Sequence, residues 1–208
     1  DLETSSGPIR DLLIAAQSWA EIRNPTPPIR RRADGGSANG GSGCLANSGN
    51  LPLRFCFLDL SQIKLKIECF YNGHDVYDDS VEFIYFRNFV SESPELAPYR
   101  TEWKIFHEEL RIAGSVDMLF QKADGSFAIY DWKRSREISR NGFNKFATTS
   151  CIKHLPDSNH WHYCLQLNIY KAILEAKYGI KVSEMKIVCL HPNNKNGNYQ
   201  CIEMADLS

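Results

Sequence analysis

The feature that most constrains this chain is the segment GSVDMLFQKADGSFAIYDWKRS, at residues 114–135. Mostly apolar, β-prone residues lie on either side of the turn-forming ADG, so the segment predicts two antiparallel strands joined by a tight turn. Because side chains alternate between the two faces of a strand, Asp131 and Lys133 should point the same way and Trp132 the opposite way. The turn returns the chain, so Asp117 should approach Asp131. Two carboxylates and an ammonium group are therefore expected to converge at one point.

This combination of charges predicts a particular chemistry. Two aspartates at such a range repel each other strongly unless a cation lies between them. Hard oxygen ligands suit Mg²⁺ or Mn²⁺, which retain several waters and take phosphate oxygens as further ligands. A bound ion would activate a water, and Lys133 would orient that water or neutralise the pentavalent phosphate. Metal-dependent phosphodiester hydrolysis fits best; the alternative is a hairpin with surface charges.

A long helix is predicted downstream, over residues 158–177, in NHWHYCLQLNIYKAILE and its flanks. His162, Gln166 and Tyr170 recur at i, i+4 and i+8, so they share one helix face that could overlook the metal site. The alternative for this polar stripe is a solvent-facing side. Another face, expected to pack on the sheet, consists of Leu165, Ile169, Ala172 and Ile173.

Between the second strand and this helix, residues 133–154 contain six basic side chains and one acidic side chain, Glu137. With Phe143 and Phe146 among them, they suit a segment that grips a phosphate backbone and stacks on bases. The alternative is solvated surface. The formal net charge of the chain is −1, so a nucleic-acid partner requires such a local patch. The candidate nucleic-acid contacts are Arg134, Arg136, Arg140, Lys145, Lys153 and His162.

Taken together, GSVD, YDWK and LQLNIY resemble the PD-(D/E)XK nuclease superfamily, in particular its RecB-like and phage-lambda-exonuclease-like branch. The resemblance covers roughly residues 51–208. It implies an α/β fold with a restriction-endonuclease-like core, in which helices flank a central mixed β-sheet. It also implies an exonuclease-like activity on DNA with Mg²⁺ or Mn²⁺ as cofactor.

The resemblance assigns roles to individual residues. Asp117 and Asp131 match metal-binding carboxylates, the backbone carbonyl of Trp132 matches a further ligand, and Lys133 matches the catalytic lysine. Glu102, in YRTEW, stands where many members carry an acidic residue on the preceding strand. The implied catalytic set, including the helix residues that contact substrate or support the site, is Asp117, Asp131, Lys133, Gln166 and Tyr170.

One position departs from the family pattern. Many RecB-like members carry H-x-x-x-E on an early helix, and the histidine binds metal. In IKLKIECFYN, Glu68 matches the acid and is a further candidate ligand, but Lys64 stands where the histidine belongs. His74 is out of register. Two other functions therefore stay open: a nucleic-acid-binding or scaffold domain with impaired catalysis, and an RNA endonuclease, because the metal triad does not read a 2′-hydroxyl.

The remaining chain predicts the domain organisation. Residues 1–50 predict a helix at 11–22, a basic IRRR and a flexible Gly/Ser-rich linker, and residues 51–208 predict the nuclease domain. IRRR suits a nuclear-import patch, a backbone-binding arm or plain solvated surface. We expect RTEWKIFHEELRIAGSVDMLFQ to form one strand or a hairpin and MKIVCLHP to form a late buried strand.

Two further helices are predicted in LSQIKLKIECFYN and DDSVEFIYFRNFVSESP, although Ile63, Leu65 and Ile67 of the first segment also fit a strand. Asp78 or Asp79 should cap the second helix and Pro94 should end it. The residues expected to line one side of this helix are Val81, Ile84, Tyr85, Asn88 and Phe89. The long helix should be capped by Asp157 or Ser158 and closed by the YG that follows it.

The seven cysteines are dispersed and include no CxxC pair, which predicts thiols rather than a disulfide framework, a zinc ribbon or an iron–sulfur cluster. This pattern favours a reducing, intracellular compartment, without distinguishing nucleus, mitochondrion and cytoplasm. No apolar run approaches the length of a membrane span, so no membrane partner is expected.

Overall fold

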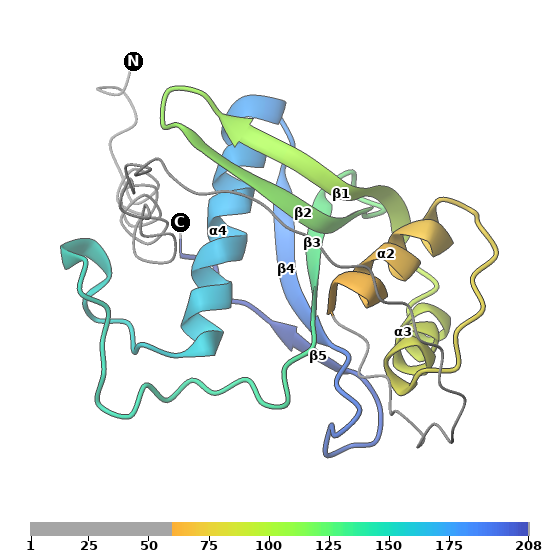
Figure 1. Cartoon of the computed structure of the whole chain (residues 1–208). Coiled ribbons are helices and arrows are strands. Elements are labelled where there is room, and N and C mark those ends of the chain that lie inside the picture. The colour runs from red at the N-terminus through yellow and green to blue at the C-terminus, as the bar shows by residue number, and fades with distance from the viewer. Residues whose placement is uncertain (1–59, 208) are drawn as a thin grey trace, which may run out of the picture.

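The structure, a computed structural model, describes residues 60–207, which form an α/β fold around one five-stranded sheet (Figure 1). The expected helix at 11–22, the IRRR motif, the linker and residues 51–59 of the expected domain lie outside the described residues.

The order of the described helices and strands along the chain produces a mixed sheet. The strand order is β1-β2-β3-β4-β5, in which only β3 and β4 pair in parallel. Parallel neighbours need a crossover connection, and α4 provides it. The elements are α2 (Leu60–Tyr71), α3 (Val81–Glu92), β1 (Ala97–His107), β2 (Ile112–Gln121), β3 (Phe127–Lys133), a 3₁₀ turn (Ser150–Ile152), α4 (Asn159–Tyr178), β4 (Val182–Cys189) and β5 (Gln200–Glu203).

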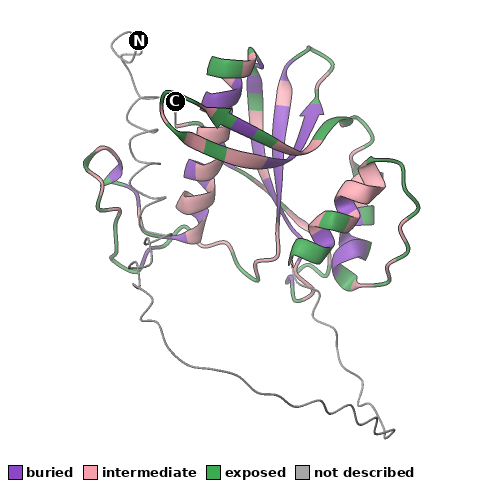
Figure 2. Cartoon of the chain, turned by 45° about the horizontal axis from the view of Figure 1, so that its top comes forward, coloured by how far each residue is buried: buried purple, intermediate pink, exposed green. Residues whose placement is uncertain are grey.

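Helices cover both faces of the sheet, so the buried side chains form two layers (Figures 1 and 2). Leu167 and Ile173 of α4 pack with Ile129 of β3 in one layer. The other layer joins α2 and α3 to Tyr130 and Trp132 of the same strand. This alternation along β3 agrees with the expectation that Trp132 points away from the face of Asp131 and Lys133.

Helix α3 confirms a predicted helix, and its phenylalanine side chains face the core. Phe86 and Phe89 meet the Trp132 ring edge-on, with ring centroids 5.5 and 5.4 Å away. Of the residues expected to line one side of this helix, Tyr85 and Phe89 are buried, whereas Val81 and Ile84 are 40% and 45% exposed. Apolar residues surround most of this helix, so its periodicity does not identify the core-facing side.

The cap of α3 is also corrected. Ser80 is the N-cap, and its Oγ accepts a hydrogen bond from the backbone N–H of Phe83 at 3.3 Å. Asp78 instead accepts the backbone N–H of Ser80 at 2.7 Å, so neither Asp78 nor Asp79 is the cap residue. The helix ends at Glu92, just before Pro94, as expected.

The other predicted elements match closely. The segment RTEWKIFHEELRIAGSVDMLFQ, expected to be one strand or a hairpin, forms a hairpin of β1 and β2. The long helix lies within one residue of its expected bounds; it begins after Ser158, whose side chain makes no capping bond, and ends at Gly179, whose φ is 65°. The short strand β5 was not predicted. Within residues 60–207, none of the five cysteines is in a disulfide and no helix is long and apolar enough to cross a membrane.

Gly114 lets α4 approach the sheet closely. A Cβ built at this position would lie 2.3 Å from Cε1 of Tyr170, although the backbone conformation itself is one that alanine adopts. The G-x-x-D pattern and the Q-x-x-x-Y helix are therefore coupled by packing.

We predict that Gly114→Ala lowers the free energy of unfolding by about 1–3 kcal/mol, because the added methyl group overpacks this contact. In a Tyr170→Ala background the same change should cost much less, since the ring is gone. A double-mutant cycle by urea denaturation measures the coupling. Equal costs in the two backgrounds would contradict the predicted contact.

Candidate active site

The two aspartates lie where β2 and β3 separate. The ladder between these strands ends at the pair Met118 and Tyr130. The next residues in register are Asp117 and Asp131, and in place of a ladder bond Oδ2 of Asp117 accepts the backbone N–H of Trp132 at 3.0 Å. Asp117 and Asp131 are only 5% and 1% exposed. The structure therefore brings together two buried carboxylates from neighbouring strands.

Each aspartate has a lysine beside it. Nζ of Lys133 lies 2.5 Å from Oδ2 of Asp131, and Nζ of Lys64, from α2, lies 2.5 Å from Oδ2 of Asp117. Among the described residues, however, no donor is aligned to make a hydrogen bond with either oxygen of Asp131. We take the Lys133 contact as an ion pair without hydrogen-bond geometry. The charge of Asp131 is thus paired with the Lys133 ammonium, but no directed hydrogen bond holds its oxygens.

Helix α4 contacts the lysine from the other side. Lys133 Nζ donates to Oε1 of Gln166 at 3.4 Å, and Nε2 of Gln166 donates to the Tyr170 hydroxyl at 2.8 Å. The Lys133 ammonium also lies 4.9 Å from the ring centroid of Tyr163. Tyr163 was not singled out from the sequence, although its spacing of three residues from Gln166 places it on the same helix side. Gln166, Tyr170 and Tyr163 together position the ammonium group.

A third acidic residue stands in the same row across the sheet. Glu102 of β1 falls opposite Asp117 in the register, and its φ of 44° is left-handed, which is uncommon for a glutamate. Its carboxylate accepts a hydrogen bond from Ser115 Oγ at 3.1 Å. Glu68 lies one turn beyond Lys64 on α2, and within the described residues it does not form a metal-binding group with the two aspartates. Of the two further candidate ligands, Glu102 is in the row and Glu68 is outside it.

The two lysines do not fully offset the negative charge. Burial and the charge of Asp131 raise the pKa of Asp117 to about 6, and the nearby charges of Lys64 and Lys133 only partly oppose this. Burial acts to lower the pKa of Lys64, but the charges of Asp117 and Asp131 outweigh it, so that pKa lies above its ordinary value. The site therefore favours a further positive charge, whether a proton or a metal ion.

The available donors suit one kind of metal ion. Mg²⁺ and Mn²⁺ are commonly held by one or two carboxylates together with waters and substrate phosphates. Within residues 60–207 no group of three or more His, Cys, Asp or Glu side chains is arranged to hold a metal ion. Asp117 and Asp131 are the two buried carboxylates at this point, and the resemblance adds the Trp132 carbonyl, so an ion held there would need water and substrate to complete its coordination.

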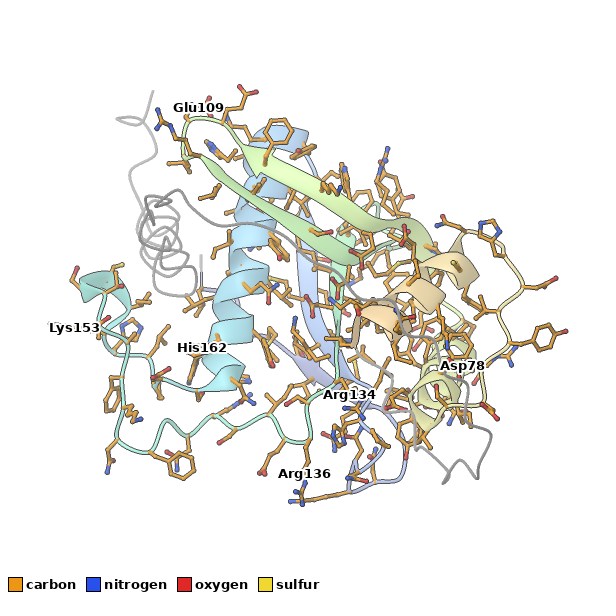
Figure 3. All side chains as sticks on the ribbon, in the orientation of Figure 1. Asp78, Glu109, Arg134, Arg136, Lys153 and His162 are labelled. Carbon is orange, nitrogen blue, oxygen red and sulfur yellow. The ribbon has the colours of Figure 1, made fainter. Side chains whose placement is uncertain are left out.

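The candidate nucleic-acid contacts are spread along the segment between β3 and α4 rather than gathered in one patch. Figure 3 shows Arg134 and Arg136 near the end of β3, with Lys153 at the far end of the segment. Nε of Arg134 donates to Oε1 of Glu82 on α3 at 2.7 Å, which ties the start of the segment to the core. The Arg, Lys and Phe side chains that are exposed along the segment are Arg136, Arg140, Lys145, Lys153, Phe143 and Phe146.

His162, the first residue of the predicted polar stripe, pairs with a residue just before α4 begins. Its Nε2 lies 2.7 Å from Oδ1 of Asp157, just before α4 begins. In the predicted polar stripe, His162 therefore contacts the end of the segment between β3 and α4. Gln166 and Tyr170 lie near Lys133 and the two carboxylates.

Comparison with known proteins supplies no further assignment: no protein-family model matches the chain, and no curated protein matches its sequence significantly.

We predict that Asp117→Asn stabilises the metal-free protein at about pH 8. The folded-state pKa of about 6 lies above the ordinary 3.8, so the ionised form opposes folding by at most about 3 kcal/mol. The contribution of Asp117 to folding stability should fall as the pH rises from about 4 to about 6 and then level off. Asparagine removes this dependence, so its advantage should shrink at about pH 4.5, where folded Asp117 is protonated.

Thermal unfolding in EDTA at both pH values measures the effect. Asp124→Asn, in the β2–β3 turn, is the matched control. The Asp124 carboxylate accepts the Ser126 N–H, so removing its charge should not raise the thermal stability. A less stable Asp117→Asn at the higher pH would contradict the prediction.

Proposed function

We propose that this protein is a divalent-metal-dependent nuclease with a PD-(D/E)XK core, which hydrolyses DNA phosphodiester bonds in an exonuclease-like manner. One observation carries the proposal: Asp117 and Asp131 are buried side by side, with the Lys133 ammonium held between Asp131 and Gln166 of α4. The mixed sheet flanked by helices fits the core that the sequence resemblance implies.

Each residue of the site has its own role in the proposed mechanism. Asp117, Asp131 and the Trp132 carbonyl would hold Mg²⁺ or Mn²⁺, which supplies an activated water and neutralises charge on the phosphate. Lys133 donates to that water or to the charge that develops on the phosphate oxygens. Gln166 fixes the ammonium group through its carbonyl oxygen, and Tyr170 receives the amide N–H on its other side. Water attacks phosphorus directly, without a covalent enzyme intermediate.

One observation favours a second candidate function, a nucleic-acid-binding or scaffold domain with impaired catalysis. Lys64 already pairs with Asp117, at the position where related nucleases are expected to carry a metal-binding histidine. An RNA endonuclease is a third possibility, because the proposed metal triad does not distinguish a 2′-hydroxyl.

We predict that Lys133→Ala reduces metal-dependent cleavage of labelled linear DNA by about 100-fold or more, because it removes a group that acts on the reacting phosphate. Full-length protein should be assayed on linear and circular DNA and on RNA, with Mg²⁺, Mn²⁺ or EDTA. Lys122→Ala is the matched control, since Lys122 pairs with Glu184 at the opposite end of β2 and should leave cleavage unchanged.

The substrate forms separate the remaining alternatives. Cleavage of linear but not circular DNA supports the exonuclease, whereas cleavage confined to RNA supports the RNA endonuclease. DNA binding without cleavage under any metal would overturn the nuclease and favour the scaffold domain.

A further inference from the structure

We propose that Lys64 is a resident cation of the active site, so that the site takes one divalent ion, on the Asp131 side, rather than two. This inference rests on the proposed nuclease function and specifies how its metal site is built. Its starting point is the row of acidic residues across β1, β2 and β3, formed by Glu102, Asp117 and Asp131.

The hydrogen bonds distinguish the two aspartates. Oδ2 of Asp117 is already engaged twice, by the Trp132 N–H at 3.0 Å and by Lys64 Nζ at 2.5 Å. Asp131, which is 1% exposed, receives no hydrogen bond on either oxygen from the described residues. The ammonium beside Asp131 belongs to Lys133, which has alternative contacts on α4 with Gln166 and the Tyr163 ring. A metal ion can therefore displace Lys133 from Asp131 more readily than Lys64 from Asp117.

The position of Lys64 is set by the core rather than by the ion pair. Its neighbours on α2, Ile63 and Ile67, are fully buried among the aromatic residues of α3 and the sheet. These contacts hold the helix so that Lys64 reaches over the end of β2, where the strands separate. The lysine thus remains in the site whether or not metal is bound.

The formal charges agree with a single ion. Glu102, Asp117 and Asp131 contribute three negative charges, and Lys64 and Lys133 contribute two positive charges, which leaves one negative charge. One divalent ion makes the site singly positive, matched to one phosphodiester. Two ions would leave a strongly positive, buried cluster, which is costly to maintain.

Calorimetric titration of Mn²⁺ into the full chain tests the inference without relying on activity. We expect about one ion per chain for the wild type and two for Lys64→His, whose imidazole adds a ligand beside Asp117. Lys64→Ala should also admit a second ion, more weakly. Lys66→Ala, on the same helix but paired with Asp78, is the matched control and should keep one ion. Circular dichroism establishes that each variant is folded.

The outcomes separate this inference from the proposed function. Two ions in the wild type would overturn the inference and leave the nuclease intact, and one ion in every variant would overturn it too. No ion in any protein would overturn the metal-dependent nuclease itself. No ion in the wild type but one in Lys64→Ala would mean that the lysine excludes metal, which overturns the inference and favours the scaffold domain.

Discussion

The arrangement of this protein depends on the repulsion between two buried carboxylates at the end of the β2–β3 ladder. The side chain of Asp117 accepts the Trp132 N–H in place of a ladder hydrogen bond. The point where the two strands separate is therefore also the point where the two carboxylates meet. The offsetting charges come from different elements: Lys64 from α2 and Lys133 from the end of β3. The folded state needs both lysines beside the carboxylates, because buried charges without partners are costly.

Each helix layer has a separate part in holding this arrangement. Helix α2 carries Lys64, and α3 supplies Glu82, which holds Arg134 just beyond β3. Helix α4 supplies Gln166 and Tyr170, and it can approach only because residue 114 lacks a Cβ. The site is therefore built on packed elements, while the exposed basic and aromatic side chains lie on the segment that links two of them.

The sequence predicts the local parts of this site well and the long-range parts poorly. The proximity of Asp117 and Asp131 follows from one turn and strand alternation, and the positions of Gln166 and Tyr170 follow from helical spacing. The Lys64–Asp117 pair could not be predicted, because it depends on how Ile63 and Ile67 of α2 pack with the aromatic residues of α3 and the sheet. For the same reason the sequence does not show that, within the set expected on one side of α3, Tyr85 and Phe89 are buried while Val81 and Ile84 are exposed. Strand β5 is too short to give a periodic signal.

The left-handed backbone of Glu102 also affects how this protein meets other copies of itself. Strand β1 is the outer strand of the sheet and is long enough to offer a row of backbone groups to another chain. Its register shifts between Pro98 and Arg100, and Glu102 then departs from extended geometry. Irregularities of this kind, together with a proline that lacks an N–H, protect a sheet edge against edge-to-edge aggregation. Glu102, which places a third carboxylate in the row, thus also makes β1 a poorer partner for a strand of another molecule.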